Sequence, residues 1–246
     1  MMHRTEGKVD QPEVLCSIPA MTVQMLRLRN VGRSQKFESG KDEVAVVALR
    51  GSVSVDTGSQ KIDLAEKDVA YLTRGASFVL ESKEDADVLW ARAPAGRAFP
   101  SYTRRFSEVK PVVSGAQSYT RHIYTSIGEK EHADRLIVGF VEGDTGNWTS
   151  FPPHRHDGKP EVYVYYGMGK RFGVQLVLGD EDRAYVVREG DAVLFEKGYH
   201  PNVATPGVGM NFVWIISAEP AERNLAVELH PEYKDMPTGP THLTTK

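Results

Sequence analysis

The chain has 246 residues, of which 40% are hydrophobic and 26% are charged. This is the composition of an ordinary globular protein, and it excludes a disordered or fibrous chain. Thirty lysines and arginines stand against 33 aspartates and glutamates, so the basic surface of a nucleic-acid-binding protein is missing.

The compartment is indicated by two further features. The single cysteine, Cys16, excludes an internal disulfide framework and is expected to be a small packed residue rather than a nucleophile. The opening residues contain no apolar segment of signal-peptide length, and no run elsewhere approaches membrane-spanning length. We therefore expect a cytoplasmic protein that does not associate with a membrane.

Short apolar runs rich in Val, Ile, Tyr and Phe recur along the chain between Gly, Asp or Lys residues. In chain order they occupy 44–49, 52–55, 161–166, 173–178, 191–195 and 211–216. Such runs are typical of β-strands, and helical periodicity over ten or more residues is hard to find. The sequence therefore predicts an all-β sandwich or barrel.

Landmarks of the first half recur in the second half. Residues 43–51 match 161–169, 68–75 match 191–198, and each half then reaches a Trp followed by small residues. The offset between matching landmarks changes only from 118 to 124 residues. We interpret this as two homologous β-domains, 1–105 and 106–246, joined where Gly, Pro and Ser cluster.

Four residues of the second half predict a metal site. His154 and His156 are two apart and would project from one face of an extended segment. Glu161 begins the next strand, and His200 follows a glycine turn at the end of a later one. Three imidazoles and a carboxylate suit Zn, Mn, Fe, Ni or Cu, among which ligand chemistry alone does not choose.

The first half provides an internal control for this site. Superposing the halves pairs the four expected ligands, in chain order, with Lys36, Glu38, Glu43 and Ser77. Three of these four positions lack suitable chemistry. We therefore expect one metal per chain, held by the second domain, while the first domain serves packing, dimerisation or closure of the site.

These motifs resemble those of known enzymes. The H-x-H-x4-E run (154–161) and the following G-D…G-x-H strand (190–200) resemble the two cupin motifs. The segments 133–157, 171–175 and 196–201 further resemble KduI/IolB-type cupins. These are the 5-deoxy-glucuronate isomerases of myo-inositol catabolism and the 4-deoxy-L-threo-5-hexosulose-uronate ketol-isomerases of pectin breakdown.

The resemblance implies a bicupin, with two tandem double-stranded β-helix (jelly-roll) barrels, and assigns His154, His156, Glu161 and His200 as ligands. It implies one divalent metal, zinc first, with Mn, Ni or Fe as alternatives, and a homo-oligomer. The implied activity is aldose–ketose isomerisation of a deoxy uronic acid, 5-deoxy-glucuronate first. The turn 157–160 is short, as in the pectin branch, so the hexosulose-uronate remains an alternative substrate.

Other residues of the site follow from strand alternation. Tyr163 and Tyr165 alternate with Glu161 and are expected on the ligand face, either as catalytic phenols or as plain core aromatics. Gln175, on a neighbouring strand, is a candidate polar contact to the substrate.

An acidic sugar also requires a cation for its carboxylate. Arg155 alternates away from the histidines that flank it, so Lys170 or Arg171 is the better candidate. A solvated surface charge is the competing interpretation of each.

Two other functions are alternatives: the first would use the same ligands, whereas the intact ligand set argues against the second. A cupin dioxygenase would bind Fe or Cu and activate oxygen, and a non-catalytic sensor would bind a sugar acid without converting it.

The other histidines are expected at the surface, and the polar, Pro- and Gly-containing ending 230–246 is expected to be a flexible tail.

Overall fold

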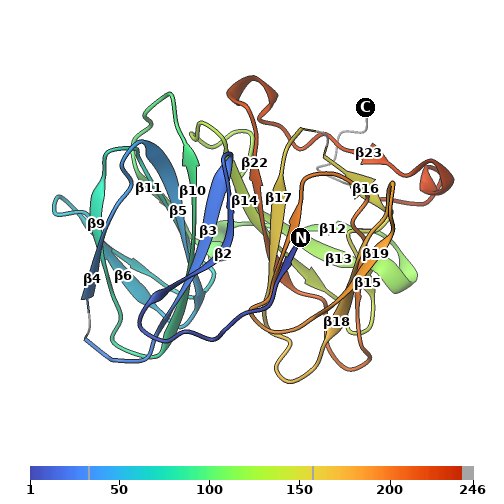
Figure 1. Cartoon of the computed structure of the whole chain (residues 1–246), viewed down its shortest axis with the longest axis horizontal. Coiled ribbons are helices and arrows are strands. Elements are labelled where there is room, and N and C mark those ends of the chain that lie inside the picture. The colour runs from blue at the N-terminus through green and yellow to red at the C-terminus, as the bar shows by residue number, and fades with distance from the viewer. Residues whose placement is uncertain (33, 157, 240–246) are drawn as a thin grey trace.

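The computed structural model describes residues 1–32, 34–156 and 158–239. Figure 1 shows the strands gathered into two bodies that lie side by side. We call residues 12–104 (β2–β11) the first barrel, and β12–β23 together with β1 the second barrel. No helix in these described ranges is long and apolar enough to cross a membrane.

The first barrel consists of two antiparallel sheets. The larger has the order β11 (Tyr102–Arg104), β8 (Val69–Leu72), β5 (Asp42–Arg50), β10 (Ala86–Pro94), β3 (Met21–Leu28) and β2 (Pro12–Ile18). The smaller has the order β4 (Ser34–Glu38), β9 (Ser77–Glu81), β6 (Val53–Asp56) and β7 (Lys61–Leu64).

The second barrel has one large and two smaller sheets. The large one has the order β1 (Met2–His3), β20 (Ala192–Phe195), β17 (Glu161–Tyr165), β22 (Phe212–Ser217), β14 (Leu136–Gly143), β13 (Arg121–Ile127) and β12 (Val112–Ser114). The others are β15 (Trp148–Thr149), β21 (Asn202–Ala204), β18 (Gly173–Val177) and β19 (Arg183–Val187), and the pair β16 (His154–Arg155) and β23 (Glu228–Leu229).

Among the residues that the structure describes, the helices are four short 3₁₀ turns: η1 (Phe106–Glu108), η2 (Gln117–Tyr119), η3 (Pro220–Glu222) and η4 (Pro231–Tyr233). The all-β prediction is therefore confirmed, and a strand covers most of each apolar run that the sequence offered. The boundary between residues 105 and 106 stays a prediction.

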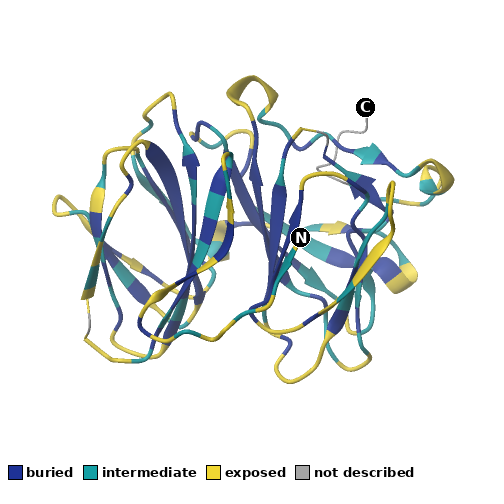
Figure 2. Cartoon of the chain, in the orientation of Figure 1, coloured by how far each residue is buried: buried dark blue, intermediate teal, exposed yellow. Residues whose placement is uncertain are grey.

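The large sheets of the two barrels face each other across a shared apolar core. On β5, Val44 and Val46 point into the first barrel, whereas Ala45 and Val47 point into the shared core. Figure 2 shows these central strands buried along most of their length. A strand buried on both faces needs apolar residues at every position, which is why this run does not alternate with polar residues.

The register of the sheets corrects one pairing of the halves. The Trp of β10 lies opposite Val46, and the Trp of β22 lies opposite Tyr163. Val46 on β5 therefore corresponds to Tyr163 on β17. Two residues before these positions stand Val44 and Glu161, so Val44 occupies the place of Glu161. The expectation that Glu43 corresponds to Glu161 is wrong by one residue, which in a strand places a side chain on the opposite face.

Glu43 instead joins the two barrels. Its fully buried carboxylate accepts hydrogen bonds from the backbone N–H groups of residues 134–136, each at 2.7 Å, and from the Tyr71 hydroxyl at 2.8 Å. Residues 134–136 belong to the entry of β14 in the second barrel. One side chain therefore satisfies several backbone donors that would otherwise be buried without partners.

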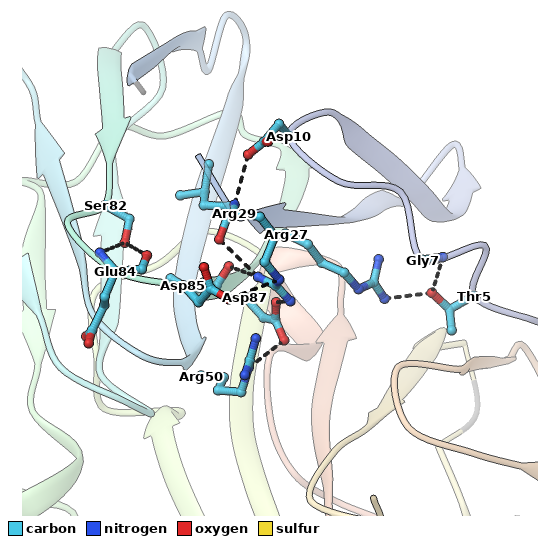
Figure 3. A network of polar contacts seen from close by, with 12 residues as sticks. Thr5, Gly7, Asp10, Arg27, Arg29, Arg50, Ser82, Glu84, Asp85 and Asp87 are labelled. Carbon is cyan, nitrogen blue, oxygen red and sulfur yellow. Dashed lines mark hydrogen bonds and ion pairs between the residues drawn. The ribbon is translucent and has the colours of Figure 1, made fainter. Parts of the chain in front are cut away.

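The N-terminal segment crosses from one barrel to the other. Strand β1 pairs with β20, and the chain then returns along the first barrel. Figure 3 shows the polar contacts that hold the return: Arg27 donates to the Thr5 hydroxyl, and the Asp10 carboxylate accepts from the Arg29 N–H. Arg29 and Arg50 both reach the Asp87 carboxylate.

The expected flexible tail is wrong for the part of it that is described. The His230 N–H donates to the Pro153 carbonyl at 2.8 Å, the Tyr233 ring packs on Phe151, and the Thr238 carbonyl accepts from the Ser114 hydroxyl. Aromatic and backbone contacts thus fix a segment whose composition indicated a loop. Residues 240–246 of that prediction lie outside the described residues.

Replacing Glu43 by Ala should lower the free energy of unfolding by about 3 kcal/mol, because several buried N–H groups lose their acceptor. Urea unfolding followed by fluorescence measures this. The control is Glu38→Ala, whose side chain is 70% exposed, and it should change stability by less than about 0.5 kcal/mol. Equal losses in the two variants would contradict the assignment.

Candidate metal centre

The four expected ligands meet in the second barrel. His154 lies on β16, His156 follows it, Glu161 opens β17, and His200 lies in the turn before β21. One ring nitrogen from each histidine lies within 4.8 Å of the others. The Oε2 atom of Glu161 is 3.1 Å from His200 Nε2 and 3.5 Å from His156 Nε2. This group could bind a metal ion.

The short loop between His156 and Glu161 is held by a buried lysine. The Lys159 ammonium donates to the backbone carbonyl of Asn224 at 2.9 Å and to its side-chain oxygen at 2.7 Å. Lys159, which lies between two of the candidate ligands, is thereby tied to the segment that leads into β23.

Backbone carbonyls orient two of the imidazoles. The Nδ1 atom of His154 lies 3.1 Å from the Pro152 oxygen, and that of His200 lies 3.1 Å from the Gly198 oxygen. Because a carbonyl only accepts, each Nδ1 must carry the proton, and each Nε2 keeps a free lone pair. This is the usual way in which a protein fixes the tautomer of a metal-binding histidine.

Three buried atoms of this group lack hydrogen bonds within the described chain, and two of them, Glu161 Oε2 and His200 Nε2, face each other at 3.1 Å; the third is His156 Nδ1. The side chains of Glu161 and His200 are almost completely buried. A buried acceptor without a partner is costly, and a divalent cation between these atoms would satisfy both. The donor set therefore fits a metal ion.

Burial also sets the protonation state of the histidines. It lowers the pKa of His154 well below its usual value and that of His156 to about 4, because the charged imidazolium loses its hydration. Both rings are thus neutral at physiological pH, which is the form that binds a metal.

A pocket opens on this group. Its described lining residues are Arg121, Ile123, Thr125, Val141, Ser150, His154, His156, Glu161, Tyr163, Trp214, Ile216 and Leu225. Tyr163 reaches the pocket, as strand alternation predicts, and its hydroxyl lies 2.9 Å from that of Ser150. Burial raises the pKa of Tyr163 well above its usual value, so the phenol stays protonated and can donate a hydrogen bond.

Tyr165 and Gln175 lie behind the metal group, outside the residues that line the pocket. The Tyr165 hydroxyl donates to Gln175 Oε1 at 2.7 Å, and Gln175 Nε2 donates to the His200 carbonyl at 2.9 Å. Both side chains are fully buried. The structure therefore gives them the task of supporting the turn that carries His200.

Lys170 and Arg171 are not brought to the pocket. Both are exposed, and the Arg171 guanidinium donates to the Gly207 carbonyl. They follow the far end of β17, whereas Glu161 begins it, and a strand of this length separates its ends by roughly 13 Å. Nearness in sequence was a poor guide because the strand carries the chain away from the metal group.

Arg121 is the charged lining residue that sequence reasoning missed. It lies on β13, is 2% exposed, and its Nη1 donates to the Phe151 carbonyl. Burial lowers its pKa to about 10, so it stays charged at neutral pH. The available signal was alternation: residues 121, 123 and 125 line the pocket from one face of the strand.

The side chains expected to be remote from the site are so. The four remaining histidines lie partly or fully exposed and outside the pocket lining. Arg155 forms an ion pair with Glu228 at 2.7 Å. Cys16 is packed in the shared core, where burial raises the pKa of its thiol to about 11.

Solved structures show which fold the chain has. The chain resembles an IolB-like protein from Salmonella typhimurium LT2 with a TM-score of 0.85 and 20% identity, covering 95% of this chain and 97% of that one. It resembles a cupin 2 conserved barrel domain protein from Leptotrichia buccalis with a TM-score of 0.54 and 14% identity, covering 84% and 88%. The fold is that of the cupins.

Within that class, the model of the KduI/IolB family matches residues 4–236, and the chain belongs to this family. It is 32% identical over 198 residues to a 5-deoxy-glucuronate isomerase of Geobacillus kaustophilus, covering 72% of each chain. It is 28% identical over 192 residues to a 4-deoxy-L-threo-5-hexosulose-uronate ketol-isomerase of Shouchella clausii, covering 72% of this chain and 67% of that one. The chain is an isomerase of this family.

The pKa of His156 predicts a pH dependence of stability for the metal-free protein, measured in the presence of a chelator. Between pH 6.5 and about 4 the unfolded chain binds a proton that the folded protein does not. Stability should therefore fall as the pH drops through this window, measured as the thermal midpoint. His156→Gln should flatten the profile and His122→Gln, at a partly exposed position, should not. Parallel profiles for wild type and His156→Gln would refute this.

Proposed function

We propose that this isomerase is metal-dependent and interconverts the aldose and ketose forms of a deoxy uronic acid, with 5-deoxy-glucuronate as the first candidate. The observation that carries the proposal is the buried group of three imidazoles and Glu161 at the wall of a pocket. We further propose that the protein acts in inositol catabolism in the cytoplasm, as a homo-oligomer.

His154, His156, Glu161 and His200 would hold one divalent ion, zinc first, with Mn, Ni or Fe as alternatives. Such an ion supplies Lewis acidity toward the carbonyl and hydroxyl oxygens of the sugar. We propose one ion per chain, because the corresponding positions of the first barrel carry residues such as Val44 and Ser77.

The protein groups around the ligands would orient the sugar. Isomerisation moves hydrogen between two adjacent carbons while charge develops on their oxygens. The protonated phenol of Tyr163 can donate a hydrogen bond to one of these oxygens, and Ser150 holds that phenol in place. Trp214, Ile216 and Leu225 supply an apolar wall that excludes water.

The hexosulose-uronate of pectin breakdown is the second candidate substrate. The short loop that Lys159 fixes between His156 and Glu161 favours it, as does the similarity to the ketol-isomerase of Shouchella clausii. Both candidates are deoxy uronic acids whose carbonyl and hydroxyl oxygens can chelate a metal, so the pocket must be tested with both.

His200→Ala should remove most of the bound metal and lower kcat/KM by about 100-fold or more, because the first coordination shell is left incomplete. Metal content is measured by plasma mass spectrometry and turnover with each uronate separately. His122→Ala, whose ring is 37% exposed beside Asp144, should keep both metal and activity.

Other outcomes would redirect the proposal. Stoichiometric metal without turnover of either uronate would overturn it, and binding of a sugar acid without conversion would indicate a sensor. Oxygen consumption with a phenolic substrate would indicate a dioxygenase. A preference of at least tenfold in kcat/KM for one uronate would identify the substrate.

A further inference from the structure

The pocket holds a buried positive charge that the metal group does not explain. Arg121 is 2% exposed, and no carboxylate of the described residues forms an ion pair with it. Its hydrogen bond within the described chain is to the Phe151 carbonyl, a neutral acceptor. An arginine carries five N–H donors, so most of its donors remain available.

A guanidinium that is buried without an anion is destabilising. Buried carboxylates elsewhere in the described chain are bound by groups other than Arg121. Glu43 accepts from backbone N–H groups, and Glu13 pairs with Arg27. Glu161 belongs to the metal group. The position of Arg121 in the pocket lining means that an anion entering the pocket can supply the missing charge.

We propose that Arg121 binds the carboxylate of the substrate and restricts the pocket to anionic sugars. The inference rests on the proposed function, which it deepens by assigning the group that recognises the acid. The fork of N–H donors on a guanidinium matches the two oxygens of a carboxylate.

The arrangement of the lining supports this role. Arg121 and Thr125 project from β13, whereas the metal group is built from β16, β17 and the turn before β21. The two ends of a sugar acid can thus be bound by different elements, the carbonyl end at the metal group and the carboxylate end at β13. The Thr125 hydroxyl is buried without a hydrogen bond and offers a second donor on the same strand face.

The other basic side chains considered for the substrate carboxylate are exposed away from the pocket or are bound by other groups. Lys170 and Arg171 are exposed beyond the far end of β17, and the Lys159 ammonium is bound by Asn224. Arg223 donates to the carbonyls of Leu136 and Gly128. Apart from the histidines, Arg121 is the one basic residue among the described residues that line the pocket.

The test compares Arg121→Met and Arg121→Lys with Arg183→Met, which removes a 58% exposed arginine of the same barrel. With the uronate substrate, Arg121→Met should lower kcat/KM by roughly 100-fold, mainly through KM, because a charge-assisted contact is lost. Arg121→Lys should recover part of the loss, since it keeps the charge. Arg183→Met should match the wild type, and metal content should be unchanged in all three.

A second measurement separates recognition from folding and from turnover. Calorimetric titration of metal-loaded wild type with D-glucuronate and D-glucose should show tighter binding of glucuronate, and Arg121→Met should abolish that preference. Absence of the preference in the wild type, or its survival in Arg121→Met, would overturn the assignment. If Arg121→Met does not fold, the wild-type preference and its reduction in Arg121→Lys decide.

These readouts also distinguish the two levels of the inference. Glucuronate binding that depends on Arg121, without turnover of either uronate, would leave the carboxylate site standing and defeat the proposed isomerase substrate. Turnover of a uronate that is unaffected in Arg121→Met would support the proposed isomerase substrate and overturn the carboxylate site.

Discussion

The burial of Glu161 among three imidazoles is the constraint on which the second barrel depends. Acceptor atoms of Glu161 and His200 face one another in the barrel interior without a hydrogen-bond partner among the described residues, so the arrangement calls for a cation. The surrounding structure keeps these atoms together. Backbone carbonyls fix two rings, Lys159 ties the loop between His156 and Glu161, and Gln175 supports the turn that presents His200.

The first barrel supports the second through a shared apolar core. Its large sheet packs against the sheet that contains β17, so Val162 and Val164 are buried in the shared core while Tyr163 and Tyr165 face the interior of the second barrel. Glu43 adds buried hydrogen bonds to the backbone of the second barrel. A strand packed on both faces cannot shift without disturbing two cores, which suits the strand that positions Glu161.

The pocket is lined by groups of opposite charge. Three imidazoles and one carboxylate form an electron-rich group at one side, and the Arg121 guanidinium stands on another strand. Each charge is costly when buried alone, and a metal-bound sugar acid would neutralise both. Binding selectivity and catalytic geometry would then follow from the same separation between β13 and the metal group.

The sequence by itself determined the strands, the repeat and the four candidate ligands, because alternation and short-range spacing are local properties of the chain. It also indicated that Tyr163 faces the ligands. Tertiary structure alone decided that Val44 and not Glu43 matches Glu161, since register is fixed by pairing with distant strands. It likewise brought Arg121, far from the motif, into the pocket and carried Arg171 away from it, because long-range strand pairing, and not distance along the chain, decides which side chains meet.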